Sequence, residues 1–337
     1  MQFGVFDHLD RNDAQLPQFY EQRLQLAELY DRAGFRSYHI AEHHATPLGM
    51  SPSPSVYLSA LAQRTKSLRF GPLVYCLPLY HPLRLTEEIC MIDQMSGGRF
   101  ELGIGRGVSP FEAKIYGLDY TQSKEIYAEY IEILLKGMTS KEITHNGQRY
   151  SFDKAPMHVE PAQKPHPPFW FGVLKPENAQ FAARHNGNFV TLLDALSTRK
   201  MIDLYRLENP LAAHHACFGQ SLFIVVAETQ EQAHTIGNRA FARWRESFHY
   251  LYYRNGTSPV FGERAQNFTE MQQQGQAIGG SAEQVRNFLQ DNIARAGINY
   301  QVGQFAFGDM SFEEIENSVS TFAQHVMPAL QDVRTPA

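Results

Sequence analysis

The sequence predicts an α/β protein in which eight parallel strands close into one barrel surrounded by helices, a (β/α)₈ barrel. Short apolar runs alternate with longer segments of helical periodicity along most of the 337 residues. Such alternation is typical of strands joined by right-handed helical crossovers, which produce a parallel sheet. Eight units of this kind suit a closed barrel better than an open sheet. We therefore expect residues 1–337 to form a single domain.

The expected strands are eight short apolar runs that end in polar residues, glycine or turns. They lie at residues 3–6, 37–41, 68–77, 99–105, 169–173, 188–193, 220–227 and 300–307. Helical periodicity is found at residues 19–34, 55–65, 84–96, 123–138, 178–187, 229–253 and 281–297. Segment 123–138 shows it clearly, because its apolar residues recur at i, i+4, i+7 and i+8 spacing.

Two segments interrupt the alternation. Residues 140–168 contain an Asn146-Gly147 turn between short extended pieces, followed by many prolines, which predicts a β-hairpin and an irregular return. Residues 250–278 show little periodicity. We expect a long irregular loop there that covers the substrate, because long insertions in barrels commonly carry binding functions.

Composition and charge exclude several classes of protein. The net charge of −5 argues against nucleic acid or an anionic membrane as a partner. Three scattered cysteines are too few for a disulfide framework or a zinc site. No apolar run approaches the roughly 20 residues that span a bilayer. The first ten residues are charged and do not resemble a signal peptide, so we expect a cytoplasmic protein.

Glu42, His43 and His44 stand side by side at the end of the second expected strand. The carboxyl ends of the strands face the active site in this fold. Three interpretations are open: metal ligands, surface residues at a strand–loop junction, or proton-transfer groups. Adjacent side chains diverge, which disfavours joint metal ligation by the two histidines. A histidine beside a carboxylate suits general acid–base catalysis.

Two glycine-containing strand ends suit a flat, phosphate-bearing ligand. Residues 103–107 ("GIGRG") combine glycines, which allow close approach of a ligand to the backbone, with the planar cation of Arg106. Residues 172–180 ("GVLKPENAQ") end a strand and begin a helix, whose free N–H groups attract phosphate beside Lys175. Each segment could equally be an ordinary structural turn or helix start.

Four segments, in this order, resemble the bacterial luciferase-like flavin-dependent monooxygenases, and most closely the luciferase α-chain branch. They are "EHH" at 42–44, "LPLYHPLRLTEE" at 77–88, "IDQMSGGRFELGIGRG" at 92–107 and "FWFGVLKPENAQFAARHNG" at 169–187. The segments "GGSAEQVRNFLQDNIARAGI" and "HVMPAL" resemble the last helices of the family. The resemblance therefore covers nearly the whole chain and implies a TIM barrel.

The resemblance also implies a reaction. Reduced FMN, supplied by a separate flavin reductase, would react with O₂ to form a C4a-(hydro)peroxyflavin. This species would oxidise a small, partly hydrophobic substrate at an aldehyde, a ketone or a heteroatom. His43 matches the catalytic histidine of the family, and Glu42 would act beside it near the flavin edge. His44 would support the loop.

Further residues match the positions that bind the cofactor in the family. Arg106, Leu174, Lys175 and Asn178 would hold the FMN phosphate, with Val173 at the same strand end. Leu73 and Val74 would lie behind the flavin ring, joined by a non-prolyl cis peptide. Gly105 takes the place of the reactive cysteine of luciferase α-chains.

The resemblance leads to expectations about partners as well. No G-x-G-x-x-G follows an expected strand, so the chain has no recognisable NAD(P)H domain and depends on a reductase. Family members pair through helices that here lie at about 55–65 and 83–95, so we expect a homodimer. The apolar residues of those helices are Val56, Leu58, Leu61, Ile89 and Ile92, although core packing would explain them equally well.

The segment 250–278 bears on the substrate and on light emission. Its aromatic residues, Tyr250, Tyr252, Tyr253, Phe261 and Phe268, suit a partly hydrophobic substrate or simple packing. The segment does not resemble the lysine-rich mobile loop of luciferase α-chains, so no light emission is expected.

Three alternatives remain open from the sequence. A deazaflavin-dependent oxidoreductase would use the same barrel for hydride transfer and would need no peroxide-handling histidine. A flavin-binding protein without catalytic activity would share the cofactor site. A metal-dependent hydrolase would use Glu42 and the histidines as ligands or base.

Overall fold

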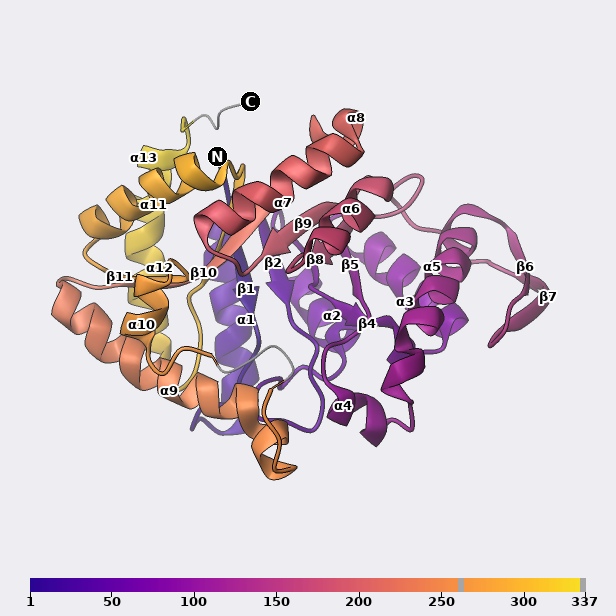
Figure 1. The fold of residues 1–337 in the computed structure, drawn as a ribbon, viewed down its shortest axis with the longest axis horizontal. Coiled ribbons are helices and arrows are strands. Elements are labelled where there is room, and N and C mark those ends of the chain that lie inside the picture. Colours follow the sequence, from indigo (N-terminus) through magenta and orange to yellow (C-terminus); the bar gives the residue numbers. More distant parts are fainter. Residues whose placement is uncertain (260–263, 334–337) are drawn as a thin grey trace.

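A computed structural model describes residues 1–259 and 264–333 of the chain. Its centre is a parallel sheet in the order β3-β2-β1-β12-β10-β9-β8-β5-β4. The bounds are β1 Gln2–Asp7, β2 Ser37–Ile40, β3 Arg69–Pro72, β4 Tyr75–Cys76, β5 Leu102–Gly105, β8 Phe169–Gly172, β9 Asn188–Thr191, β10 Phe218–Val226 and β12 Tyr300–Gln304. Helices surround this sheet (Figure 1).

The sheet closes on itself because β3 and β4 come from one stretch of chain. Tyr75 of β4 pairs with Ile104 of β5, and Phe70 of β3 forms a bridge to Phe100 just before β5. The eight strand runs expected from the sequence are thus confirmed, with the third divided in two. The division falls at the Leu73–Val74 peptide, which is cis as the resemblance implied.

The outer helices follow the strands in chain order. Their bounds are α1 Leu16–Arg32, α2 Pro54–Arg64, α3 Pro82–Met95, α4 Pro110–Ile115, α5 Ser123–Thr139, α6 Pro176–Arg184, α7 Ala195–Glu208, α8 Pro210–Ala213, α9 Gln230–Arg254, α10 Phe268–Gln273, α11 Ala282–Ala296, α12 Phe312–His325 and α13 Met327–Leu330. Short 3₁₀ turns lie at Leu77–Leu79 and Tyr120–Gln122. Among the described residues, no helix is long and apolar enough to cross a membrane.

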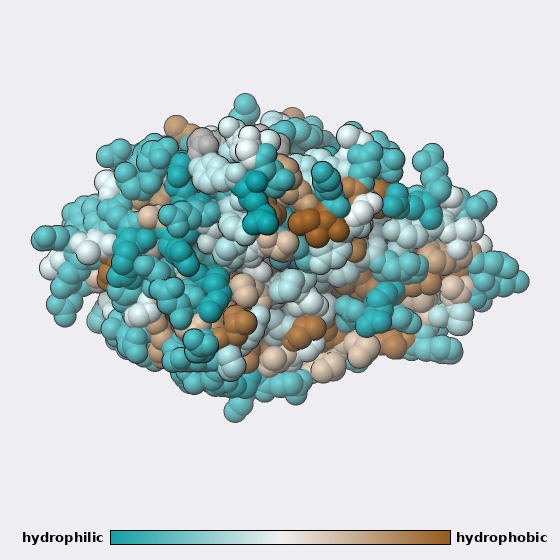
Figure 2. Space-filling view, turned by 90° about the horizontal axis from the view of Figure 1, so that it is seen from below, coloured by the Kyte–Doolittle hydropathy of each residue, from teal (hydrophilic) through white to brown (hydrophobic). Residues whose placement is uncertain are grey.

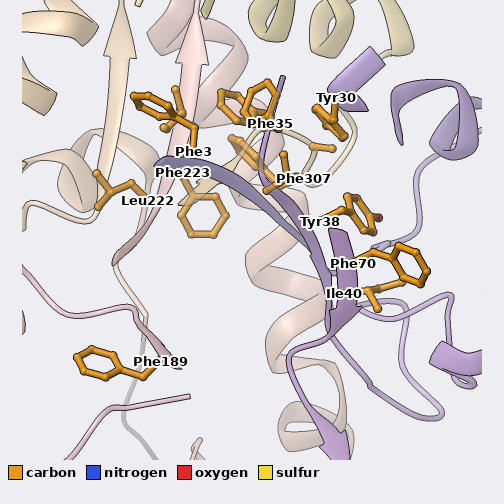
Figure 3. Packing of buried hydrophobic residues seen from close by; sticks show 14 of the residues in the cluster. Phe3, Tyr30, Phe35, Tyr38, Ile40, Phe70, Phe189, Leu222, Phe223 and Phe307 are labelled. Atoms are coloured by element: carbon orange, nitrogen blue, oxygen red, sulfur yellow. The ribbon is translucent and has the colours of Figure 1, made fainter. Parts of the chain in front are cut away.

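Most of the core lies between the barrel and the helices. Tyr30, Phe35 and Phe3 gather beside β1 (Figure 3), and the rings of Tyr30 and Phe35 meet edge to face at 5.4 Å. A second, smaller core fills the inside of the barrel. It comprises Phe6, Ala41, Trp170, Val190, Tyr300 and Val302.

The amino-terminal end of the barrel is filled by polar and aromatic side chains. Glu101 is fully buried and pairs with Arg36 at 2.9 Å and Arg69 at 2.8 Å. Above this ion pair, the hydroxyl of Tyr300 lies 3.0 Å from Nε2 of His39. These contacts close this end of the barrel.

His39 makes the stability of the fold sensitive to acid. Burial lowers its pKa to about 4, against about 6.5 in an unfolded chain. The unfolded state therefore binds more protons between these values, so stability is full above pH 6.5 and falls as the pH drops toward 4. The loss from this group is about 3 kcal/mol. His39→Gln keeps a hydrogen-bonding group toward Tyr300. The free energy of unfolding of this variant, measured by urea titration between pH 4 and 7, should depend less on pH than that of the wild type. An unchanged slope would contradict the assignment.

The predicted hairpin is confirmed as an antiparallel pair of strands at the edge of the molecule (Figure 1). Its strands are β6, Glu142–Asn146, and β7, Ser151–Pro156. Glu129 of α5 holds the hairpin, because its Oε1 lies 3.2 Å from Nε2 of His145 and accepts a hydrogen bond from the N–H of Tyr150.

The prediction of a long irregular loop at 250–278 is wrong at both ends of that segment, whereas residues 255–259 and 264–267 lie outside helices and strands. The helical periodicity expected at 229–253 is confirmed by α9, Gln230–Arg254. Helix α9 continues to Arg254 and carries Tyr250, Tyr252 and Tyr253, while α10 buries Phe268 in the core. Residues 277–280 form a further strand, β11, Ala277–Gly280, beside the second half of β10. Phe261 lies outside the described residues. The sequence also gave no sign of α7, whose first turn Asp194 caps through the N–H groups of Leu196 and Ser197.

Candidate active site

Glu42 and His44 form a buried frame at the carboxyl end of β2. The Oε1 of Glu42 lies 2.8 Å from Nε2 of His44, and its Oε2 accepts a hydrogen bond from the N–H of Cys76. The hydroxyl of Tyr116, just after α4, lies 2.8 Å from Nδ1 of His44. Both oxygens of Glu42 are therefore engaged by the protein, which fixes the loop between β2, β4 and α4.

His43 points away from this frame and pairs with a different carboxylate. Its Nδ1 lies 3.1 Å from Oε1 of Glu112 on α4, and the other oxygen of Glu112 accepts the N–H of His44. The side chain of His43 is 15% exposed. Its Nε2 has no hydrogen-bond partner among the described residues. A carboxylate at Nδ1 favours a proton on that nitrogen, which leaves Nε2 as an acceptor.

The two neighbouring histidines thus serve different partners, as diverging side chains predict. No group of three histidine, cysteine, aspartate or glutamate side chains in the described part of the chain could hold a metal ion. The imidazole of His43 with its buried carboxylate is the arrangement used for general acid–base catalysis.

His8 lies beside His43 at the end of β1. The two rings stack at 5.9 Å with an interplanar angle of 21°. Trp244 of α9 meets the ring of His8 edge to face at 5.7 Å. Burial, together with His43 and Arg264, holds the pKa of His8 well below its usual value. His8 is therefore a neutral imidazole at neutral pH.

Leu73, Val74 and Gly105 lie together where β3, β4 and β5 meet. A Cβ atom on Gly105 would lie 2.3 Å from Cγ2 of Val74, so the valine side chain occupies the space that a larger residue would need. Leu73 packs against the core inside the barrel. All three residues are half-buried, which suits contact with a flat ring.

This contact predicts that Val74 and Gly105 are energetically coupled. Gly105→Ala should lower the free energy of unfolding by about 1–3 kcal/mol, the usual cost of overpacking. Adding Val74→Ala should restore part of the loss, because the shortened side chain frees the space. Urea unfolding of both single variants and the double variant measures the coupling. Simple additivity of the two losses would show that the residues do not compete for space.

The residues expected to bind phosphate lie on two neighbouring strand ends. β5 pairs with β8 through Leu102–Phe169 and Gly103–Trp170, so the segments that follow lie side by side. Arg106 is exposed, with its guanidinium 5.1 Å from the ring centre of Tyr120. Lys175 caps α6 without a side-chain cap bond, and Asn178 lies exposed in the first turn. A cation and a helix start therefore converge on one edge of the barrel.

Val173 and Leu174 contribute differently to this edge. The side chain of Val173 is fully buried in the core, and its N–H donates to the carbonyl of Val190. Only the carbonyl of Val173 remains for the contact expected from the sequence. Leu174 is half-buried, and Gly172 is exposed with open space on its Cβ side.

Glu112 and His8 were not found from the sequence. A signal for Glu112 exists in Ser109-Pro-Phe-Glu112, the spacing of a capping box. Ser109 does accept the N–H of Glu112, but the glutamate side chain turns to His43 instead of back to the cap. His8 follows directly after the first strand, at the same end of the barrel as Glu42, and could have been found on that ground.

A partly exposed imidazole paired with a buried carboxylate lies at one end of a (β/α)₈ barrel, the end that also carries the glycine-bearing strand ends and the start of α6. Comparisons with known proteins identify the family. The model of the luciferase-like monooxygenase family matches residues 1–300. The chain belongs to this family.

Relatives are found over different lengths of the chain. The uncharacterized protein y4wF of Sinorhizobium fredii is 39% identical over 96% of both chains. The oxygenase component of the flavin-dependent trigonelline monooxygenase of Acinetobacter baylyi is 32% identical over 56% of this chain and 53% of its own.

Solved structures share the fold. The monooxygenase RslO1 of Streptomyces bottropensis has a TM-score of 0.85 at 25% identity and is matched over 97% of this chain and 99% of its own. Two more distant structures show the fold alone. They are the FMN-bound oxygenating constituent of 3,6-diketocamphane monooxygenase of Pseudomonas putida (TM-score 0.79, 18% identity, 100% and 99% of the two chains) and an F420-dependent secondary alcohol dehydrogenase (TM-score 0.75, 19% identity, 98% and 99%).

Proposed function

We propose that this chain is the oxygenase component of a two-component monooxygenase that takes reduced FMN from a separate reductase. With O₂ it oxidises a small, partly hydrophobic substrate at an aldehyde, a ketone or a heteroatom. The observation that carries the proposal is the pair of His43 and Glu112 at the barrel mouth, 3.1 Å apart. It leaves Nε2 of His43 without a hydrogen-bond partner among the described residues and so available as a proton acceptor.

The residues present fit FMN. A flat ring needs an approach unhindered by side chains, and Gly172 provides this with open space on its Cβ side, while Gly105 on the neighbouring strand end adds no side chain beyond that of Val74. A phosphate needs a cation and free N–H groups, and Arg106 with the start of α6 provides both. Leu174, Lys175 and Asn178 line that helix start. Bound there, reduced flavin supplies the electrons that activate oxygen.

The protein's own part is to place and protect the reaction. Glu42 and His44 hold the loop that carries His43, and Glu112 orients the His43 ring through Nδ1. His43 then holds or moves one proton at that nitrogen. The apolar rings of α9 beside His8 exclude water from the same space.

The need for a separate reductase rests on two observations. The chain has no dinucleotide-binding fingerprint, and the trigonelline enzyme of Acinetobacter baylyi is named as an oxygenase component. We place the protein in the cytoplasm, where NAD(P)H and reductases supply reduced flavin.

We further propose a homodimer formed through α2 and α3. Four of the five apolar residues considered for this contact, Leu58, Leu61, Ile89 and Ile92, are buried in the monomer core. Exposed apolar side chains on the same helices remain available, namely Val56 at 73%, Met91 at 50% and Met95 at 50%.

A deazaflavin-dependent oxidoreductase is the second candidate, because an F420-dependent dehydrogenase shares the fold. Stopped-flow spectroscopy separates the two. Protein loaded anaerobically with reduced FMN is mixed with oxygenated buffer, and a near-ultraviolet absorption band is followed before oxidised flavin appears. A lasting band is the expected result. Oxidation at the rate of free reduced FMN, without a band, would contradict the proposal and favour the deazaflavin enzyme or a flavin-storage protein.

A further inference from the structure

Four rings in consecutive contact connect His43 to Arg264. They are His43, His8 and, on α9, Trp244 and Phe248, and Trp244 and Phe248 form what is called the α9 wall below. His43 stacks on His8 at 5.9 Å, and His8 meets Trp244 at 5.7 Å. Trp244 stacks on Phe248, one turn further along α9, at 5.0 Å and 24°. The guanidinium of Arg264 then covers the ring of Phe248 at 4.7 Å. This row of rings therefore joins the proposed proton-transfer group to a cation.

Arg264 has no counter-ion among the described residues. Its contacts in the described part of the chain are the ring of Phe248 and an electrostatic interaction with His8. It is nevertheless half-buried, and burial lowers its pKa. A cation in apolar surroundings costs free energy unless an anion pairs with it. The site is thus electrostatically incomplete.

His8 is incomplete in the same way. It is 8% exposed, yet neither ring nitrogen has a hydrogen-bond partner among the described residues. Neither nitrogen is among the fully buried, unpartnered polar atoms, so both keep some exposure to solvent. A neutral imidazole has one N–H to donate and one nitrogen to accept.

We propose that Arg264 and His8 bind the carboxylate of the substrate. This rests on the proposed function and deepens it, because it names the substrate class as a small carboxylic acid with an apolar or aromatic body. Arg264 supplies the charge and His8 one N–H donor. Trp244 and Phe248 contact the apolar body, and His43 lies at the other end of the row of rings.

The number of charges favours a carboxylate over a phosphate ester. One guanidinium neutralises a single negative charge, and His8 stays neutral because burial, His43 and Arg264 lower its pKa. A phosphate group carries close to two charges at neutral pH, and no second cation contacts His8 among the described residues. Arginine also matches the planar carboxylate through paired N–H groups.

Calorimetry with matched probes tests the proposal without any oxygen chemistry. Wild-type protein is prepared in two samples, one free of flavin and one loaded with oxidised FMN. Each sample is titrated with benzoate, phenylacetate, hexanoate and cinnamate and with the amide of each acid. We expect at least one acid to bind at least tenfold more tightly than its amide. Arg264→Met should remove this preference, and His8→Phe, which retains a ring beside Trp244, should weaken it.

Arg243→Met is the matched control, because Arg243 lies on the same helix as Trp244 but is 45% exposed and pairs weakly with Glu246 at 3.9 Å. It should keep the full preference. No acid preferred over its amide anywhere in the panel would overturn the proposal, as would a preference that survives both Arg264→Met and His8→Phe. If calorimetry shows the preference for acids but stopped-flow spectroscopy shows no near-ultraviolet band, the carboxylate site is supported and only the monooxygenase function is rejected.

Discussion

His43→Ala is expected to shorten the life of the near-ultraviolet band by a factor on the order of 10², the lower end of what a positioned proton-transfer group contributes. The reason is local. Glu112 orients the ring at 3.1 Å from Nδ1, and alanine removes both the ring and its free Nε2. Single-turnover stopped-flow measurements give the decay constant, and hydrogen peroxide released per flavin should rise in parallel.

Glu112→Gln should have a smaller effect in the same direction. The amide keeps the shape of the side chain but no longer offers a carboxylate to Nδ1 of His43, so the ring is oriented less firmly. Glu129→Gln is the matched control, because Glu129 also faces a histidine, His145, at 3.2 Å but lies under the hairpin. Equal effects of the two substitutions would mean that the loss comes from general destabilisation.

The second large effect is expected in the core inside the barrel. Trp170→Ala should lower the free energy of unfolding by about 3–5 kcal/mol, as is usual when a large buried aromatic residue is truncated. The Trp170 ring is fully buried and contacts His39 at 4.7 Å and Tyr300 at 5.3 Å, while Arg36 covers it. Neighbouring strands cannot move inward to fill the space, because each is held on both sides in a closed sheet.

Urea unfolding followed by circular dichroism measures this loss. Leu207→Ala is the control, because Leu207 is 81% exposed and its truncation should change stability by less than about 0.5 kcal/mol. A loss below about 1 kcal/mol for Trp170→Ala would show that the inside of the barrel is not tightly packed, contrary to the structure.

The barrel was predictable because its signal is local. Each strand is a short apolar run such as Phe169–Gly172, and its neighbour in the sheet follows from chain order. The expectation of an irregular segment from residue 250 onward failed at the last turn of α9 for a physical reason. Its buried residues, including Leu251 and Tyr252, are mixed with exposed tyrosines, so the apolar stripe is hard to recognise without its packing partner. Phe111 of α4 is such a partner, with its ring 5.4 Å from that of Tyr252.

The candidate site was predictable in part. His43 and Glu42 stand at a strand end and carry a recognisable motif. The partners of these residues carry no such motif. The contact between His43 and Glu112 joins residues 69 positions apart, in two segments that follow different strands. The stack of His8 on His43 and the position of Arg264 depend likewise on how the loops above the strands meet. Pairing across loops is set by tertiary packing, which leaves little trace in local sequence.

The ion pair of Glu101 with Arg36 and Arg69 determines by which end of the barrel reactants enter and products leave. Together with Tyr300 it blocks one end of the barrel, so every reactant and product must use the opposite opening (Figure 2 views the molecule from the side of α4 and the end of α9). Under the proposed function, flavin, oxygen and organic substrate share that passage. A substrate lying on the α9 wall would obstruct a flavin that arrives later. The proposed function therefore predicts an order of binding, flavin before substrate, and an excess of substrate should act as an inhibitor competitive with reduced FMN.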